Sequence, residues 1–300
     1  MDVFGIVASG QEKYLRDAVL RAAFELALSS ALPATAEDAA RALGVRSSRR
    51  LRRLLEALAL FGFARAEGEV FHARALSPAP LGPVPDAGWG WLAEVIRTDR
   101  PVAEPGVSGN DAPEALRRFH SYLFETGAAP ARELWTVVRP GFGPLLDLGG
   151  GTGAYAAAFP GEATLVDTAA VLRLSQAPRA KRLALDLLSG IYPGEQGVVL
   201  LSNVLHLFGA GDCRAIVRKA AAALRPGGLL LVKDLEIDAA RTGPAESVLF
   251  ALNMALFTEA GDVHLPLVIE GFLRDAGLGP PLRLRLETSP NSLVLACAKP

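Results

Sequence analysis

The chain has 300 residues, of which half are hydrophobic and 21% are charged, a composition typical of one large or two smaller folded domains. Its formal net charge of −1 gives no overall field that would favour nucleic acid or an anionic membrane. Cys213 and Cys297 are its only cysteines, so we expect neither a disulfide framework nor a metal site. No secretory signal and no long uncharged apolar segment is evident, which predicts a cytoplasmic protein without a membrane span.

The first third of the chain has the pattern of a winged helix. Three segments place apolar residues at helical spacing, at 14–28, 35–44 and 47–62. Thr35, with Asp38 three residues on, is the candidate N-cap of the second segment, and Ser47 or Ser48 is that of the third. Two short apolar runs around Gly68 predict a small hairpin. We therefore place a mainly helical, winged-helix-like domain at residues 1–80.

A connector follows this domain. Residues 77–111 are rich in proline and glycine, and Trp89–Thr98 is a possible helix within them. The next segment, Ala115–Val138, is helical in pattern. Residues 81–140 are thus predicted to hold a connector and helices, and the last domain covers residues 141–300.

The last domain alternates between strands and helices. Five strands are predicted, at 145–148, 164–167, 183–187, 197–205 and 229–237. Two further runs, LRLRLET and SLVLACAK, are joined by SPN and predict a final antiparallel hairpin. The alternation indicates the α/β class, with a Rossmann-like, doubly wound and mostly parallel sheet.

A glycine-rich loop follows the first of these strands in LLDLGGGTGAY. Gly149, Gly151 and Gly153 permit a tight turn and let a ligand touch the backbone. The helix after the loop offers unpaired N–H groups to a ligand oxygen, at the edge where such sheets bind ligands. Asp167 ends the next strand, twenty residues after Asp147, where a carboxylate accepts hydrogen bonds from two ribose hydroxyls.

Two other interpretations of the loop compete with a nucleoside site. Gly149-x-Gly151-x-x-Ala154 matches the dinucleotide pattern G-x-G-x-x-A, and a tight turn without any ligand is the simplest reading. Two features count against a nicotinamide enzyme. Asp147 stands directly before the loop, where dinucleotide folds carry an apolar residue, and the chain ends in an antiparallel hairpin.

Five motifs in this order resemble the class I S-adenosylmethionine-dependent methyltransferases: LLDLGGGTGAY, LVDTAAVL, ALDLL, VVLLSNVLHLF and LRPGGLLLVKDLEI. More narrowly, almost the whole chain resembles the small-molecule O-methyltransferases that carry an N-terminal winged-helix dimerisation domain. The resemblance implies S-adenosyl-L-methionine as cofactor and methyl transfer to a hydroxyl of a small aromatic or polyketide-like natural product. It also implies a homodimer formed through the N-terminal domain.

The resemblance assigns the cofactor contacts residue by residue. The loop below the methionine part is formed by Asp147, Gly149, Gly151 and Gly153. Asp167 holds the ribose, and Asp186 with Leu187 matches the adenine contact. Ser202 and Asn203 match positions beside the sulfonium.

The resemblance also assigns the catalytic pair. His206 follows the fourth strand and matches the general base, and Asp234 ends the fifth strand and matches the acid that orients this histidine. In the family, an acid and an aromatic residue follow the base, whereas Leu207-Phe208 follow it here. His264 stands near a basic position of the family, without the acid that follows it there.

The missing second acid leaves three alternatives for the reaction. The enzyme relies on proximity alone, its acceptor ionises easily, or the fold binds S-adenosylmethionine but catalyses a non-methylating reaction. Candidate acceptor contacts are aromatic, Met or polar residues of two helices, namely Phe119, His120, Asn253, Met254 and Phe257. Such residues also occur in cores; as pocket walls they favour an apolar acceptor.

A winged helix also suggests a DNA reader. The helix SSRRLRRLLEAL and the arginine directly before it would offer five arginines to phosphates: Arg46, Arg49, Arg50, Arg52 and Arg53. A winged-helix regulator with a ligand-sensing domain is therefore the non-enzyme alternative. The chain has no net basic charge, and an arginine run on a helix is usually a solvated or salt-bridged face. We expect no nucleic-acid partner.

Overall fold

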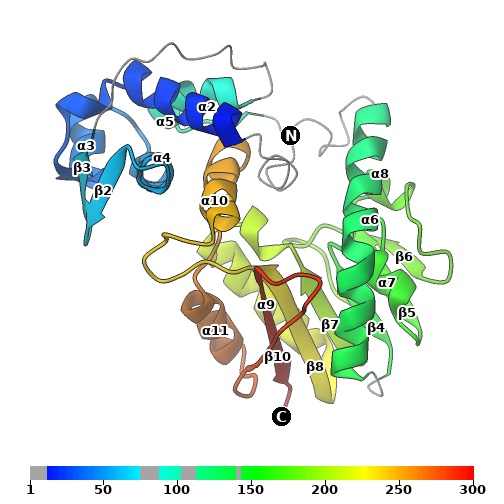
Figure 1. Cartoon of the computed structure of the whole chain (residues 1–300). Coiled ribbons are helices and arrows are strands. Elements are labelled where there is room, and N and C mark those ends of the chain that lie inside the picture. Colours follow the sequence, from blue (N-terminus) through cyan, green and yellow to red (C-terminus); the bar gives the residue numbers. More distant parts are fainter. Residues whose placement is uncertain (1–11, 75–87, 103–112, 140–142) are drawn as a thin grey trace. The chain divides into compact units, whose positions relative to one another are not determined.

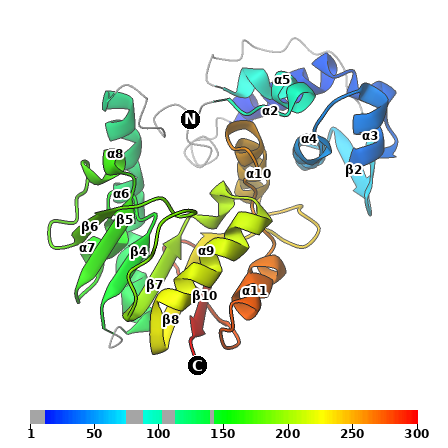
Figure 2. The ribbon, with the colours of Figure 1, turned by 180° about the vertical axis from the view of Figure 1, so that it is seen from behind.

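The computed structural model describes residues 12–74, 88–102, 113–139 and 143–300. The chain divides into two compact units (Figures 1 and 2). The first unit combines Met1–Glu104 with Ile237–Val263, and the second combines Pro105–Glu236 with His264–Pro300. Most of the expected connector lies outside the described residues. The domain boundaries near residues 80 and 140 stay predictions.

The N-terminal part of the first unit contains short helices and a small sheet. Its helical elements are α2 (Glu12–Glu25), η1 (Leu28–Ser30), α3 (Ala36–Leu43), α4 (Ser48–Leu60), η2 (Trp89–Trp91) and α5 (Leu92–Thr98). The strands β1 (Ala34–Thr35), β2 (Ala64–Glu67) and β3 (Val70–Ala73) form a sheet in the order β1-β3-β2. The predicted caps are present: Thr35 accepts a hydrogen bond from the Asp38 N–H, and Ser47 accepts one from the Arg50 N–H.

The segment Ile237–Val263 belongs to the first unit, although the sequence pattern placed it in the last domain. Its helix α10 (Ala245–Phe257) packs against α4. Leu249, Leu252 and Leu256 of α10 are buried in one hydrophobic core with Leu51, Leu54 and Leu58 of α4. This packing depends on contacts between residues about 200 positions apart, which local periodicity does not encode.

The second unit contains one sheet of seven strands in the order β6-β5-β4-β7-β8-β10-β9. The strands are β4 (Leu145–Leu148), β5 (Ala163–Asp167), β6 (Lys181–Ala184), β7 (Gln196–Ser202), β8 (Leu224–Leu235), β9 (Leu282–Leu284) and β10 (Ser292–Ala298). The first five are parallel, and β10 pairs antiparallel with both β8 and β9. This confirms the predicted α/β fold with its final antiparallel hairpin. The order reverses between β4 and β7, the switch point where such sheets bind ligands.

Helices cover both faces of this sheet (Figures 1 and 2). One core contains side chains of α9 (Ala210–Ala223) and α11 (Pro266–Asp275), and the other contains those of α6 (Pro113–Val138) and α7 (Ala154–Ala158). Every residue of β4 is buried, as expected for a central parallel strand. No helix in the described part of the chain is long and apolar enough to cross a membrane.

Several predicted strand bounds differ from the structure. The fourth strand, expected at 197–205, lies at Gln196–Ser202, and the run LRLRLET is a strand only at Leu282–Leu284. The third strand, expected at 183–187, lies at Lys181–Ala184, so Asp186 and Leu187 stand in the loop after it. The fifth, expected to begin at Leu229, begins at Leu224, because the chain between α9 and the central part of β8 already pairs with the start of β7. Gly227 within this stretch takes a left-handed φ of 72° that a glycine adopts without strain.

Candidate active site

The glycine loop connects β4 to the short helix α7. Gly149, Gly151 and Gly153 have φ angles of 65°, 60° and 93°, which residues with a side chain rarely adopt. Gly150 is required for space instead: a Cβ there would lie 2.5 Å from Leu165 Cδ1 and 2.6 Å from the carboxyl carbon of Asp147. All four glycines of GGGTG are therefore needed, although the sequence pattern singled out only three.

Asp147 is fully buried directly before this loop. Neither of its carboxylate oxygens has a hydrogen bond of normal geometry among the described residues. The pKa of Asp147 is raised to about 7, mainly by burial; the Ala156 backbone N–H offsets this in part, and the charge of Asp167 adds to the rise. A buried acid without a partner is costly, so a ligand group that donates hydrogen bonds or carries positive charge fits here.

Asp167 ties the end of β5 to the glycine loop. Its Oδ2 accepts a hydrogen bond from the Gly151 N–H at 2.9 Å, and its Oδ1 accepts one from the Thr168 N–H at 2.7 Å. A carboxylate has about four acceptor sites, so further donors such as ribose hydroxyls can still bind. The structure thus places Asp167 beside the loop, as the sequence predicts.

Asp186 lies in the exposed loop after β6, and its own loop already uses one of its oxygens. Oδ1 accepts hydrogen bonds from the Leu188 N–H at 3.0 Å, the Ser189 N–H at 2.7 Å and the Ser189 hydroxyl at 2.8 Å. Leu187 next to it is half-buried. Asp186 therefore shapes the turn, and adenine contact by Asp186 and Leu187 stays a prediction.

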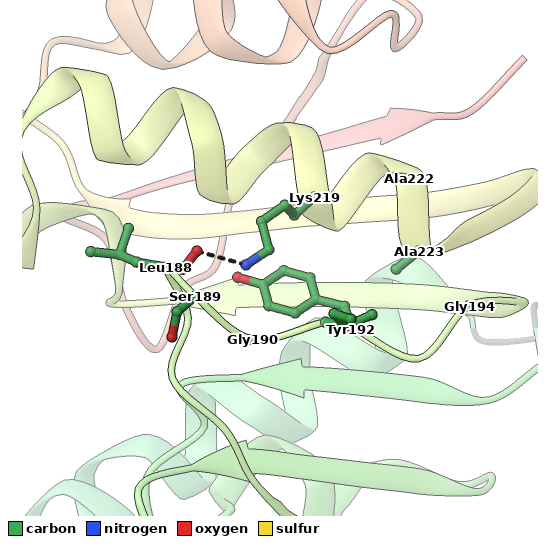
Figure 3. Close-up of a pocket in the computed structure, with 9 residues that line it drawn as sticks. Leu188, Ser189, Gly190, Tyr192, Gly194, Lys219, Ala222 and Ala223 are labelled. Atoms are coloured by element: carbon green, nitrogen blue, oxygen red, sulfur yellow. Dashed lines mark hydrogen bonds between the residues drawn. The ribbon is translucent and has the colours of Figure 1, made fainter.

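A groove of about 490 Å³ lies beside this loop, between Leu188–Gly194 and α9 (Figure 3). Lys219 lines it and donates hydrogen bonds to the carbonyl oxygens of Leu187 and Leu188, at 2.9 and 3.0 Å. The Lys219 ammonium also lies 4.5 Å from the centre of the Tyr192 ring. The only cation of the groove lining thus already has partners within the loop.

Ser202 and Asn203 end β7 at the switch point. Asn203 is exposed and has a left-handed φ of 56°, unusual for a residue with a side chain. Its N–H donates to the Lys233 carbonyl of β8 at 2.7 Å, which fixes this turn. The Ser202 hydroxyl is buried; it lies near Tyr155 but forms no hydrogen bond of normal geometry among the described residues. Strain and an unsatisfied hydroxyl together are typical of a functional site.

His206 and Asp234 form a buried pair. His206 lies in η3 (Leu205–Leu207) after β7, and its Nδ1 is 2.7 Å from Oδ1 of Asp234 at the end of β8. The His206 backbone N–H also donates to Asp234 Oδ2, at 3.2 Å. Burial disfavours the charge of Asp234, but His206, the Leu235 N–H and His264 together outweigh this and lower the pKa of Asp234 below its ordinary value. An acid that binds Nδ1 leaves the basic lone pair on Nε2, the arrangement of a general base.

His264 supports the turn that carries His206. Its Nε2 lies 2.9 Å from the Phe208 carbonyl and 3.2 Å from the Leu205 carbonyl, at either end of η3. Cys213 of α9 lies 3.3 Å from the same nitrogen, and burial raises the pKa of the Cys213 thiol to about 12, so this thiol stays protonated. His264 therefore stabilises the backbone around His206.

The sequence profile of the O-methyltransferase domain matches residues 111–278, more than half of the chain. The chain belongs to the O-methyltransferase domain family. The match covers the glycine loop, Asp167, the His206–Asp234 pair and His264.

Individual relatives agree with this family. The 3-hydroxy-5-methyl-1-naphthoate 3-O-methyltransferase of Streptomyces sahachiroi is 28% identical over 229 residues, 71% of this chain and 66% of that protein. The tetracenomycin polyketide synthesis 8-O-methyl transferase TcmO of Streptomyces glaucescens is 28% identical over 252 residues, 77% of this chain and 71% of that protein. The chain thus spans slightly less than two thirds of the naphthoate enzyme.

The whole chain has the same fold as a solved structure. It is an O-methyltransferase family 2 protein from Planctomyces limnophilus DSM 3776 in complex with apigenin. It superposes with a TM-score of 0.76 and 20% identity, covering 100% of this chain and 97% of that chain. At this identity the match establishes the fold alone.

Two predicted acceptor residues of this family member lie on α6 in the second unit. His120 is buried above the loop, 4.0 Å from where a Cβ on Gly151 would lie, and neither ring nitrogen has a partner among the described residues. Its carbonyl accepts a hydrogen bond from the Thr152 hydroxyl at 3.1 Å. Burial lowers the pKa of His120, while Asp167 opposes this shift. Phe119 is half-buried, and its ring meets that of His120 edge-on at 5.4 Å.

The other three predicted acceptor residues belong to α10 in the first unit. Asn253, Met254 and Phe257 are all buried. The Trp89 Nε1–H donates to Asn253 Oδ1 at 3.2 Å, and a Cβ on Gly88 would lie 2.5 Å from the Phe257 ring. Packing within the first unit thus accounts for the burial of Asn253 and Phe257, and a contact of the three with the acceptor stays a prediction.

One buried polar residue next to Asp234 is not among the site residues that the sequence predicts. Lys233 precedes Asp234 on β8 and is only 5% exposed. The sequence does mark this residue: Lys233 is a cation directly after the apolar run LLLV, whose pattern is that of a buried central strand. The described residues contain no cluster of side chains suited to a metal ion.

Proposed function

We propose that the protein transfers the methyl group of S-adenosyl-L-methionine to a hydroxyl of a small aromatic or polyketide-like molecule. Family membership supports the reaction class. The names of two relatives, which act on a hydroxynaphthoate and in tetracenomycin polyketide synthesis, support the acceptor class.

The edge of the sheet at β4 and β5 fits this cofactor. The buried Asp147 lacks a partner that an ammonium group would supply, and the loop of Gly149, Gly151 and Gly153 leaves backbone open to a ligand. Asp167, beside the loop, has acceptor sites left for the ribose hydroxyls. When bound, the cofactor supplies a methyl group on a sulfonium, and its carbon–sulfur bond breaks as the acceptor oxygen takes the methyl group.

The observation that carries the proposal is the buried His206–Asp234 pair. A phenol has a pKa of about 10 and is a weak nucleophile at neutral pH, so a base that takes its proton speeds the transfer. Nε2 of His206 receives this proton, and Asp234 stabilises the imidazolium that results. One acid is sufficient for this function, and the contacts of His264 hold η3 in place.

The non-methylating alternative stays open, and the transfer assay below tests it. The arginines of α4 weigh against the regulator. A DNA-binding regulator would require accessible arginines on α4, yet Arg50 and Arg53 are buried, and Arg49 and Arg52 bond to Gly261 and Glu37. We therefore favour an enzyme without a nucleic-acid partner.

We further propose that the first unit is a winged-helix-like dimerisation domain. Support comes from the order of its elements, with α3 and α4 followed by the β2–β3 hairpin, and from the resemblance described above. Light scattering of the purified protein behind a sizing column tests this. The mass of two chains supports the proposal, and that of one chain at micromolar concentration contradicts it.

A transfer assay tests the proposed reaction. The protein is incubated with methyl-labelled S-adenosylmethionine and a panel of naphthols, hydroxynaphthoates and flavonoids, and label in the organic product is measured. We expect label on oxygen for at least one acceptor, with equimolar S-adenosylhomocysteine. Tight binding of the adenosyl ligands without transfer to any hydroxyl would favour the non-methylating alternative.

A further inference from the structure

Lys233 is a buried cation at the carboxyl end of β8. In the parallel register it lies beside Ser202 of β7, and in the antiparallel register beside Val294 of β10. Leu231, Leu200 and Val294 belong to the core on the α6 side, so Lys233 and Ser202 point to that face by strand alternation. Asp234 follows Lys233 and points to the opposite face.

The ammonium group of Lys233 forms no ion pair among the described residues. No hydrogen bond or ion pair of its ammonium group occurs within the described residues, and Asp234, its neighbour in sequence, is the only charge that affects it. Burial lowers the pKa of Lys233 to about 8, so the group is still mainly protonated at neutral pH. A buried lysine without an ion pair is costly, and an apolar residue would pack at this position at no such cost.

The neighbours of Lys233 complete a site for an anion. The Ser202 hydroxyl beside it is buried and lies near Tyr155, but has no hydrogen bond of normal geometry among the described residues. A hydroxyl also accepts hydrogen bonds, so the Ser202 proton can be donated to the same ligand oxygen. The Asn203 N–H fixes the Lys233 carbonyl at 2.7 Å, which holds the ends of β7 and β8 together. A cation and a hydroxyl on adjacent strands match a carboxylate.

The strand order distinguishes two sources of such a carboxylate. The cofactor has a methionine carboxylate, but the glycine loop follows β4, two strands away from β8 and thus about 10 Å distant in the sheet. His206 and Asp234 lie at the same strand ends as Lys233, on the other face of β8. An acceptor held at this edge would place its hydroxyl toward His206 and a second group toward Lys233.

We propose that Lys233, with Ser202, recognises a carboxylate on the acceptor, so that the acceptors are hydroxylated aromatic acids. This inference rests on the proposed methyl transfer for the identity of the acceptor. Lys233 is a specificity residue in this account: it binds the acid group and takes no proton from the hydroxyl.

Matched acceptors and variants test this. Hydroxynaphthoates are compared with naphthols of the same ring size in wild type, Lys233→Met, Lys233→Arg and the exposed-lysine control Lys181→Met. For the acids, kcat/KM should fall about 10- to 100-fold in K233M, largely through KM, and recover in part in K233R. For the naphthols it should change less than about threefold, as for every acceptor in K181M.

Binding separates this inference from the proposed reaction. Calorimetry with protein saturated in S-adenosylhomocysteine should show tighter binding of a hydroxynaphthoate than of the naphthol, a preference that K233M loses. That result supports the inference even if no methyl transfer is found. Equal affinity of wild type for acid and naphthol, or a K233M variant that loses affinity for S-adenosylhomocysteine instead, would overturn it. Thermal unfolding of each variant identifies a change that comes from misfolding.

Discussion

The first unit and the second unit both bury charged side chains, but they treat these charges differently. In the first unit, Arg53 of α4 bonds to Glu56 at 2.5 Å and to Asp262 at 2.6 Å, and Arg241 bonds to the same two acids. Arg50 bonds to Asp99 at 2.6 Å. Each buried arginine thus has an acid partner, and the network ties the segment 237–263 to α4.

In the second unit, several buried polar groups at the carboxyl edge of the sheet lack such partners. Asp147 and Lys233 have no counter-charge in contact, and neither His120 nor Ser202 has a hydrogen bond of normal geometry within the described residues. Folded proteins leave few buried polar groups unsatisfied, so a cluster of them indicates missing ligand atoms. The buried arginines of the first unit thus have acid partners, although Arg53 Nε and the Ser247 hydroxyl also lack a hydrogen bond there, whereas Asp147 and Lys233 of the second unit are buried without an ion pair in the described part of the chain.

The largest expected effect is a loss of turnover when the His206–Asp234 pair is broken. His206→Ala should lower kcat by about 10²- to 10⁴-fold, because the acceptor hydroxyl loses its base. Affinity for S-adenosylhomocysteine should change less than about threefold, as measured by calorimetry. The matched control is His72→Ala, a partly exposed histidine of the first unit. A large loss of cofactor affinity in H206A would show that His206 has a structural role instead.

Breaking the ion-pair network around Arg53 in the first unit should lower the stability of the protein. Arg53→Met leaves Glu56 and Asp262 with Arg241 alone and should lower the free energy of unfolding by about 3 kcal/mol. Urea denaturation measures this, with the exposed Arg46→Met as control, for which we expect a change within about 0.5 kcal/mol. A loss below about 1 kcal/mol in R53M would contradict a structural role for the network.

Replacing Asp147 should raise the free energy of unfolding instead of lowering it, because the charge of Asp147 is unpaired among the described residues. The folded chain keeps this proton up to about pH 7, whereas the unfolded chain loses it near pH 4, so ligand-free stability falls as pH rises between these values. Asp147→Asn should therefore raise the free energy of unfolding by about 2 to 4 kcal/mol at pH 8 and hardly change it at pH 4.

Ligand binding gives the second measurement on Asp147. Because an ammonium group of the ligand favours the ionised acid, wild-type affinity for S-adenosylhomocysteine should rise from pH 6 to pH 8, and D147N should lose this rise. A destabilised D147N at pH 8, or a pH-independent wild type, would show that Asp147 has a partner in the folded chain.

The smallest expected effect is that of replacing Asp167, because backbone N–H groups already bind its two carboxylate oxygens. Asp167→Ala should weaken S-adenosylhomocysteine about 10- to 100-fold, because charged hydrogen bonds to the ribose are lost. At saturating cofactor its kcat should stay within about threefold of wild type. A variant with normal affinity and a low kcat would reverse the roles that we assign to Asp167 and His206.

Much of this architecture is local in the sequence and was predictable. The caps Thr35 and Ser47, the buried run LLDL and the glycine loop each follow from residues within a few positions. Asp167 and His206 were found because the ends of parallel strands meet at one edge. Their roles, however, came from the family resemblance.

The rest depends on contacts that no local pattern contains. Whether Arg53 is exposed or paired depends on Asp262, more than 200 residues later, and α10 packs on α4 over a similar separation. Lys233 differs from an ordinary strand lysine because it is buried and forms no ion pair with any of the described residues. Whether a buried polar group has a hydrogen-bond partner can be seen only in the folded structure.

We propose that the carboxyl edge of the sheet in the second unit, where Asp147 is buried without a partner among the described residues, binds an adenosyl ligand. The most direct test is a calorimetric titration of the purified protein with S-adenosylmethionine, S-adenosylhomocysteine and NAD. We predict micromolar binding of both adenosyl ligands and none of NAD. Binding of NAD alone would identify a dinucleotide site, and no binding of any of the three would contradict the claim.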